Sequence, residues 1–148
     1  MTKTLFLLTV LCSGASGQFE IYLKEPNKIP LYAQETNVWC GAASAQMMLE
    51  GFPRGVKHKF EQKMIWDTIQ TMKVEQSWYT DPDGLKNVMD KLGDDSHWVT
   101  TCSKTADPLM RFLVRNLSDR KFPTSVLVYG DAHWVVIIGA TLDNDPNE

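Results

Sequence analysis

Apolar residues follow a helical period over the first two thirds of this chain and gather into unbroken runs in the last third. Over 59–72 they recur at the three- and four-residue spacing of one helix face, at Phe60, Met64, Ile65, Ile69 and Met72. The same spacing and the terminal residues predict three more helices: 41–49 with Gly51 at its end, 85–92 capped by Thr80 or Asp83 and closed by Gly93, and 107–117 opening at Asp107-Pro108.

The apolar runs of the last third predict strands. Residues 124–129 (TSVLVY) and 133–140 (HWVVIIGA) are β-branched and continuous, and Gly130-Asp131-Ala132 separates them, which predicts a hairpin in a buried sheet. A further strand is predicted over 97–102, whereas 18–33 is expected to be an extended lead-in and 141–147 a turn. Helices first and strands later indicate an α+β fold.

Composition narrows the class of protein without identifying it. The chain has 148 residues, 43% of them hydrophobic and 22% charged, which is typical of one globular domain. Its net charge is −3 and it has no basic run, so we expect no nucleic-acid partner, because phosphate contacts need clustered Lys and Arg.

The first seventeen residues resemble an export signal. Lys3 precedes the apolar run 5–11 (LFLLTVL), and small residues at 13–17 offer cleavage after Ala15 or Gly17. We therefore expect residues 18–148 to form the mature domain, secreted or periplasmic, with no stable membrane insertion, since seven apolar residues are too few to span a bilayer. The alternative is that this segment is a buried N-terminal strand.

Two cysteines remain after the expected signal, Cys40 and Cys102. In an oxidising compartment they would be able to form a disulfide, which is the plainest alternative for Cys40. Cys102 lies in the β-prone run 98–102 and is expected to be a buried, small apolar residue.

The surroundings of Cys40 point to nucleophilic chemistry. Cys40 stands where the helix 41–49 begins, and a helix N-terminus stabilises a thiolate. The small residues at 41–43 leave room for a substrate carbonyl, and the backbone N–H of Cys40 is available to an oxyanion. The side-chain amide of Gln34, six residues earlier, offers a second donor.

One of the three histidines is placed to act as the general base. His58 lies in a Lys-His-Lys run and is expected to be solvated, and His97 follows a polar stretch at the start of the strand predicted over 97–102. His133 follows a tight turn and opens the most apolar strand, which would hold it rigidly at the mouth of a cleft.

The blocks Gln34-x5-Cys40-Gly41-Ala42-Ala43 and His133-Trp134-Val135-Val136, with 80–85 (TDPDGL) between them, resemble the papain-like superfamily and within it bacterial C39-like cysteine peptidases. The resemblance spans about residues 30–140. It implies an N-terminal helical lobe carrying Cys40, packed on a C-terminal antiparallel sheet carrying His133. It also implies hydrolysis of a peptide or protein substrate without a metal or organic cofactor, with Gln34 as the oxyanion donor.

The C-terminal end departs from that pattern. Such enzymes orient the histidine with an Asn or Asp on a returning strand, and this chain offers only Asp143, Asn144 and Asp145 in the turn expected over 141–147. Asp143 is the first of these candidates, and a truncated sequence or a Cys-His dyad is the alternative.

Three other functions stay open: glutamine deamidation or acyl transfer on the same residues, a non-catalytic binding module on the same fold, and a plain disulfide-bridged exported domain.

Overall fold

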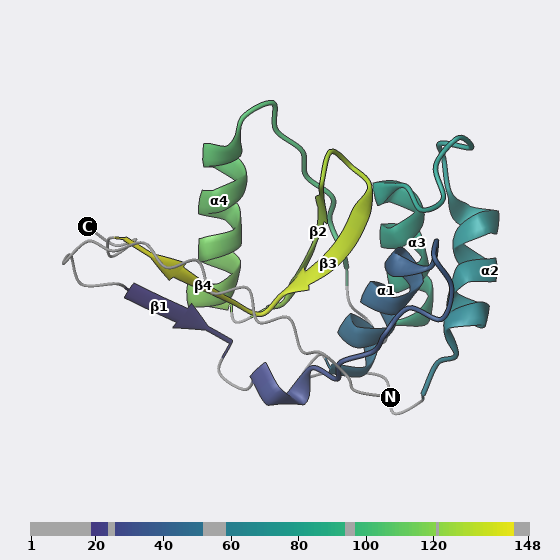
Figure 1. The fold of residues 1–148 in the computed structure, drawn as a ribbon, viewed down its shortest axis with the longest axis horizontal. Helices are drawn as coiled ribbons and strands as arrows, with labels where there is room; N and C mark the ends of the chain where they lie inside the picture. Colours follow the sequence, from purple (N-terminus) through teal and green to yellow (C-terminus); the bar gives the residue numbers. More distant parts are fainter. Residues whose placement is uncertain (1–18, 24–25, 52–58, 94–96, 121, 144–148) are drawn as a thin grey trace.

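The computed structural model describes most of the chain: residues 19–23, 26–51, 59–93, 97–120 and 122–143. Within these ranges it forms a mixed α+β fold, as the sequence predicts, with four α-helices and, in place of the single C-terminal sheet expected, two small antiparallel sheets (Figure 1). The expected export segment and the candidates Asn144 and Asp145 lie outside the described residues. No helix in the described part of the chain is long and apolar enough to cross a membrane.

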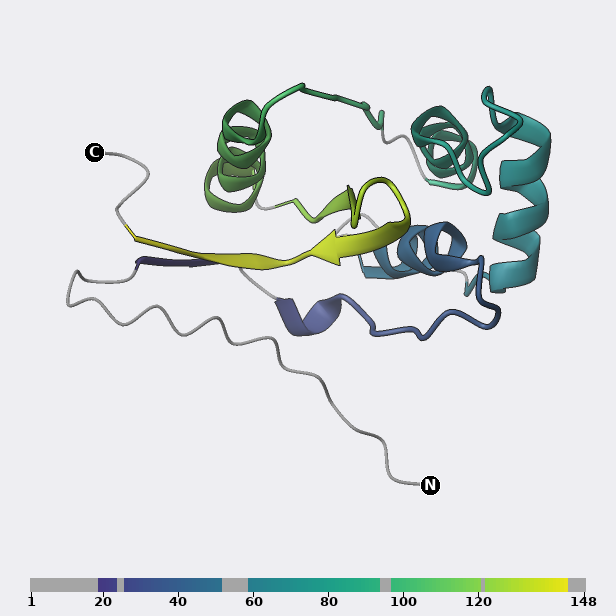
Figure 2. The same ribbon diagram turned by 45° about the horizontal axis from the view of Figure 1, so that its top comes forward.

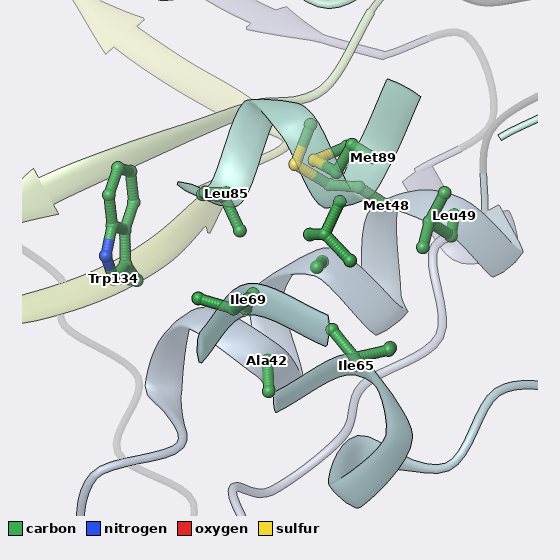
Figure 3. Packing of buried hydrophobic residues seen from close by; sticks show 10 residues of the cluster. Ala42, Met48, Leu49, Ile65, Ile69, Leu85, Met89 and Trp134 are labelled. Carbon is green, nitrogen blue, oxygen red and sulfur yellow. The ribbon is translucent and has the colours of Figure 1, made fainter. Parts of the chain in front are cut away.

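Three helices form one group, and all three were predicted: α1 (Cys40–Gly51), α2 (Gln62–Met72) and α3 (Pro82–Leu92). The apolar stripes of α2 and α3 converge on α1, whose small Ala42 and Ala45 are fully buried and allow close helix approach (Figure 3). Ile65 and Ile69, one helical turn apart on α2, fill the centre of this core with no exposed surface.

The predicted hairpin is confirmed, but the burial expected for its sheet is wrong, because Trp134 is the one buried residue of the two strands and the others are half-buried. Strand β2 (Thr124–Val128) pairs antiparallel with β3 (His133–Ile137), in a register that sets Val128 opposite His133. The connecting turn has positive φ at Tyr129, Gly130 and Asp131. In both ribbon views β3 lies beside α1, so the strand that His133 opens packs on the helix that Cys40 opens (Figures 1 and 2).

The predicted turn over 141–147 is wrong in its first part. Thr141 and Leu142 belong to β4 (Gly139–Leu142), which pairs antiparallel with β1 (Phe19–Tyr22). A strand forms only where a neighbouring strand can pair with it. The neighbour of β4 is β1, which lies within the residues 18–33 that were expected to be an extended lead-in. Gly139 lies against the Tyr22 ring, at a point where a side chain would collide with it.

The helix predicted from Asp107-Pro108 is confirmed as α4 (Ala106–Arg115), and a π-helical turn, η2 (Asn116–Arg120), extends it. None of the residues of α4 is fully buried. Leu117 of η2 is fully buried and joins Ile21 and Leu23 in a second, smaller apolar cluster, away from the helical group. A short 3-10 turn, η1 (Pro26–Lys28), follows β1.

The strand predicted over 97–102 is wrong, and so is the burial expected for Cys102. Residues 97–103 are in neither helix nor strand, and Val99 and Cys102 are exposed. The backbone N–H of Trp98 donates to the carboxylate of Asp90 at 2.8 Å. Within the described residues no strand edge pairs with this β-prone sequence, so 97–103 stay irregular.

Candidate active site around Cys40 and His133

Cys40 is the first residue of α1, as the sequence predicts. The carbonyl of Trp39 accepts the first helical hydrogen bond, from the N–H of Ala43 at 2.9 Å. The N–H groups of Cys40 and the two residues after it therefore have no partner within the helix, which gives this end its partial positive charge. The thiol is free and half-buried.

Gly41 lets another segment lie directly against the start of α1. A Cβ atom at this position would come within 2.5 Å of Thr80 Cγ2 and 2.7 Å of Thr80 Oγ1. The Thr80 side chain therefore occupies the space that any larger residue at position 41 would need. Thr80 is only 5% exposed, and its hydroxyl has no hydrogen-bond partner among the described residues.

The strand opened by His133 reaches the same residue. The indole of Trp134, 8% exposed, packs in the helical core near Leu85 and Ile69 (Figure 3). Its Nε1 donates a buried hydrogen bond of 3.0 Å to the backbone carbonyl of Thr80. The residue after Cys40 and the residue after His133 thus both contact Thr80.

The Cys40 thiol and the His133 imidazole are not hydrogen-bonded to each other in the described structure. Side chains alternate along a strand, and Trp134 and Val136 face the helical core. His133, half-buried at the first position of β3, therefore starts on the opposite face of the hairpin. A thiolate–imidazolium pair therefore requires the backbone at the start of β3 to move, because rotation of the ring alone does not bring a side chain to the other face of a sheet.

The structure does not bring Asp143 to His133. Strand β4 continues in the direction of β3 and carries the chain away from α1 (Figure 2). Ten residues of extended chain span roughly 30 Å. The exposed Asp143 follows the end of β4 and lies far from the imidazole that it was expected to orient.

Gln34 lies in the segment before α1 and is half-buried. Its side-chain amide makes no hydrogen bond to any described residue. The peptide groups on both sides of it are held by one buried side chain, Gln62 of α2: Nε2 donates to the Ala33 carbonyl at 2.8 Å, and Oε1 accepts from the Glu35 N–H at 3.0 Å. Sequence reasoning missed Gln62, because nothing local links positions 62 and 34.

A second contact ties this segment to the far end of α1. The Tyr32 hydroxyl donates to the Glu50 carboxylate, and this hydrogen bond, followed by burial and the charge of Glu50, raises the Tyr32 pKa above its ordinary value of 10.0. Glu50 also accepts from the backbone N–H of Phe60 at 3.0 Å. The segment that carries Gln34 is thus attached to α1 as well as to α2.

Asp81 caps α3, so the expected caps Thr80 and Asp83 are wrong. Its Oδ1 accepts from the Gly84 N–H at 2.7 Å, and its Oδ2 accepts from the backbone N–H groups of Val74 and Glu75 at 2.8 and 2.7 Å. Asp81 is 3% exposed, and Pro82 follows it at the first helical position. This carboxylate fixes the segment that presents Thr80 to α1 and β3.

A row of aromatic rings borders the start of α1. Trp39 stacks on Trp66 of α2 with ring centroids 6.0 Å apart, and Trp66 in turn contacts Tyr79 at 6.5 Å. Tyr79 is 66% exposed, whereas the two tryptophans are half-buried. The row thus runs from the residue before Cys40 to an exposed ring.

The remaining candidates of the sequence take no part in this arrangement. Cys102 and Cys40 are both free, so the structure holds no bridge between them. His97 is exposed, and His58 lies outside the described residues. No cluster of His, Cys, Asp and Glu suited to a metal ion occurs within the described ranges. A hollow of about 370 Å³ is formed by Glu61 and the outer face of α2, and its lining includes neither Cys40 nor His133.

Comparison with known proteins adds no relative to this picture: no protein-family model, curated protein or solved structure matches the chain.

Proposed function

We propose that this chain is an exported cysteine peptidase with a papain-like arrangement, similar to the bacterial C39-like group. The observation that carries the proposal is the convergence on Thr80: Gly41 beside Cys40 and Trp134 beside His133 both contact that one residue. The position of Cys40 at the N-terminus of a twelve-residue helix supports it, because the helix end favours a thiolate.

The proposed reaction is acyl transfer through the sulfur. The Cys40 thiolate attacks the carbonyl carbon of a peptide, the S–C bond forms, and the amine leaves with a proton from the His133 imidazolium. Water, deprotonated by His133, then attacks the thioester and returns the thiol. The Cys40 N–H and the Gln34 amide are the proposed donors to the oxyanion in both steps. Asp143 has no role in this mechanism, so His133 acts with Cys40 as a dyad.

The proposed substrate is a peptide or protein, met outside the cytoplasm after removal of residues 1–17. The aromatic row of Trp39, Trp66 and Tyr79 suits the apolar side chains of such a substrate. The mechanism uses neither a metal nor an organic cofactor, because thiolate, imidazole and oxyanion donors suffice for it.

A second candidate function is a non-catalytic peptide-binding module on the same fold. The separation of Asp143 from His133 and the lack of a thiol–imidazole hydrogen bond favour it. In this function the aromatic row and the segment around Gln34 would hold a peptide without cleaving it.

Digestion of casein tests the proposal and separates the candidates. We expect the native chain to cleave casein, and Cys40→Ala and His133→Ala each to lose nearly all cleavage while keeping the native circular dichroism spectrum. Mass analysis distinguishes the related activity, because glutamine deamidation adds about one dalton without splitting the substrate. Cleavage at the native rate by either variant contradicts the proposal, and saturable binding of casein peptides without any product supports the binding module.

A further inference from the structure

We propose that Gln62 is a positioning residue that presents Gln34 to the oxyanion, an inference that rests on the peptidase function proposed above. Gln62 is the first residue of α2 and is only 2% exposed. Its amide uses both of its ends on the peptide groups that flank Gln34, at Ala33 and Glu35. It therefore holds the backbone on each side of Gln34, as a neighbouring strand would hold it.

The hydrogen bonds of Gln62 serve the Gln34 segment and not α2 itself. The N-cap residue of α2, Glu61, makes no side-chain capping bond, and the Gln62 amide is directed to residues 33–35 instead of to its own first turn. Burying a flexible amide costs side-chain entropy and desolvation, which its two hydrogen bonds offset. Both residues that it binds are exposed, so the burial of their side chains does not explain why their backbone is held.

The segment that is held leads directly to the nucleophile. A turn closed by the Trp39 N–H and the Thr36 carbonyl, at 3.3 Å, joins it to Cys40. The amide of Gln34 has no partner among the described residues, so it is available to a ligand. A donor contributes to an oxyanion hole only if it is fixed before charge develops, and the amide of Gln62 supplies that restraint.

Two reagents separate the oxyanion from the thiolate. With p-nitrophenyl acetate, the Cys40 thiolate attacks the acetyl carbon, negative charge develops on the carbonyl oxygen, and p-nitrophenolate leaves with the electron pair of the broken C–O bond. Iodoacetamide alkylates the same sulfur by displacing iodide and develops no oxyanion. We would follow the first reaction by p-nitrophenolate release, corrected with Cys40→Ala, and the second by the mass of the peptide that carries Cys40.

We expect Gln34→Ala to slow acetylation about 100-fold, the usual loss for one oxyanion donor. Gln62→Met should slow it roughly ten-fold, since the donor is still present but no longer held in place. The double variant should acetylate no more slowly than Gln34→Ala alone, because Gln62 acts through Gln34. Alkylation of Cys40 by iodoacetamide should keep its native rate in all three.

The matched control is Gln70→Met on the same helix, which also loses a side-chain hydrogen bond to a backbone carbonyl, that of Tyr79 at 2.7 Å. It should acetylate at the native rate. If Gln62→Met does not fold, Gln62→Glu replaces it, because the carboxylate keeps the acceptor for Glu35 and loses the donor to Ala33.

Three results would overturn the inference. Native acetylation by a folded Gln62 variant would show that Gln62 does not position the donor, and native acetylation by Gln34→Ala would show that there is no such donor to position. A double variant slower than Gln34→Ala would assign Gln62 a separate role. If the native chain itself shows no Cys40-dependent release of p-nitrophenolate, the peptidase proposal fails, and the inference fails with it.

Discussion

The indole Nε1 of Trp134 donates a hydrogen bond of 3.0 Å to the backbone carbonyl of Thr80, which is 54 residues earlier in the chain. This buried bond joins the strand that His133 opens to the segment that covers the start of α1. Helix α1 begins at Cys40 and strand β3 begins at His133, and both elements contact Thr80.

Trp134→Phe should therefore destabilise the fold. The substitution keeps an aromatic ring in the core but leaves a buried carbonyl without its donor, which costs about 1–3 kcal/mol. Urea unfolding measures the loss. Trp66→Phe is the control, because it also replaces an indole that packs on the same core by the smaller phenyl ring. The Trp66 indole makes no hydrogen bond to any described residue. Equal losses in the two variants would mean that the hydrogen bond adds nothing to the stability.

Asp81→Ala should be one of the most damaging single substitutions in the loop before α3. Three backbone N–H groups lose a buried acceptor, which should lower the free energy of unfolding by about 2–4 kcal/mol. Asp83→Ala, an exposed residue in the first turn of the same helix, should cost less than about 1 kcal/mol. Similar unfolding midpoints for the two variants would contradict the role of Asp81 as the cap.

Tyr32 should make stability fall in alkaline solution. The fold raises its pKa above 10.0, so its contribution is fully present below pH 10.0 and is lost as the pH rises through the raised value. The difference in unfolding free energy between the native chain and Tyr32→Phe should thus be constant below pH 10.0 and shift against the native chain as the pH rises above 10.0. Unfolding in urea between about pH 8 and 11 measures this difference. A difference independent of pH would contradict the Tyr32–Glu50 bond.

Much of the fold was predictable because its signals are local. The stripes of α2 and α3 repeat within one helix, and the two apolar runs of the hairpin are separated by a single turn. The cap of α3 was also within reach of the sequence, since Asp81 followed by Pro82 is a capping residue followed by proline at the first helical position.

The rest depends on contacts between distant parts of the chain. The last two residues of β4 were missed because their partner strand, β1, lies at the other end of the described residues, and because the turn residues Asp, Asn and Pro follow them directly in the sequence. The strand predicted over 97–102 failed for the converse reason, because no strand in the described part of the chain pairs with it. From the sequence, the site candidates are Cys40, His133, Gln34 and Asp143, whereas Thr80 and Gln62 are identified by hydrogen bonds that span dozens of residues.

The most direct test of the central claim is the rate of Cys40 alkylation by iodoacetamide against pH, in the native chain and in His133→Ala. The exposed thiol of Cys102, read from the same digests, serves as the internal reference. A rate already high near pH 6, and lowered about ten-fold or more by His133→Ala, is the result that a thiolate–imidazolium pair predicts. A rate that rises only near pH 8.5, parallel to Cys102 and unchanged by the substitution, would contradict the peptidase proposal and favour the binding module.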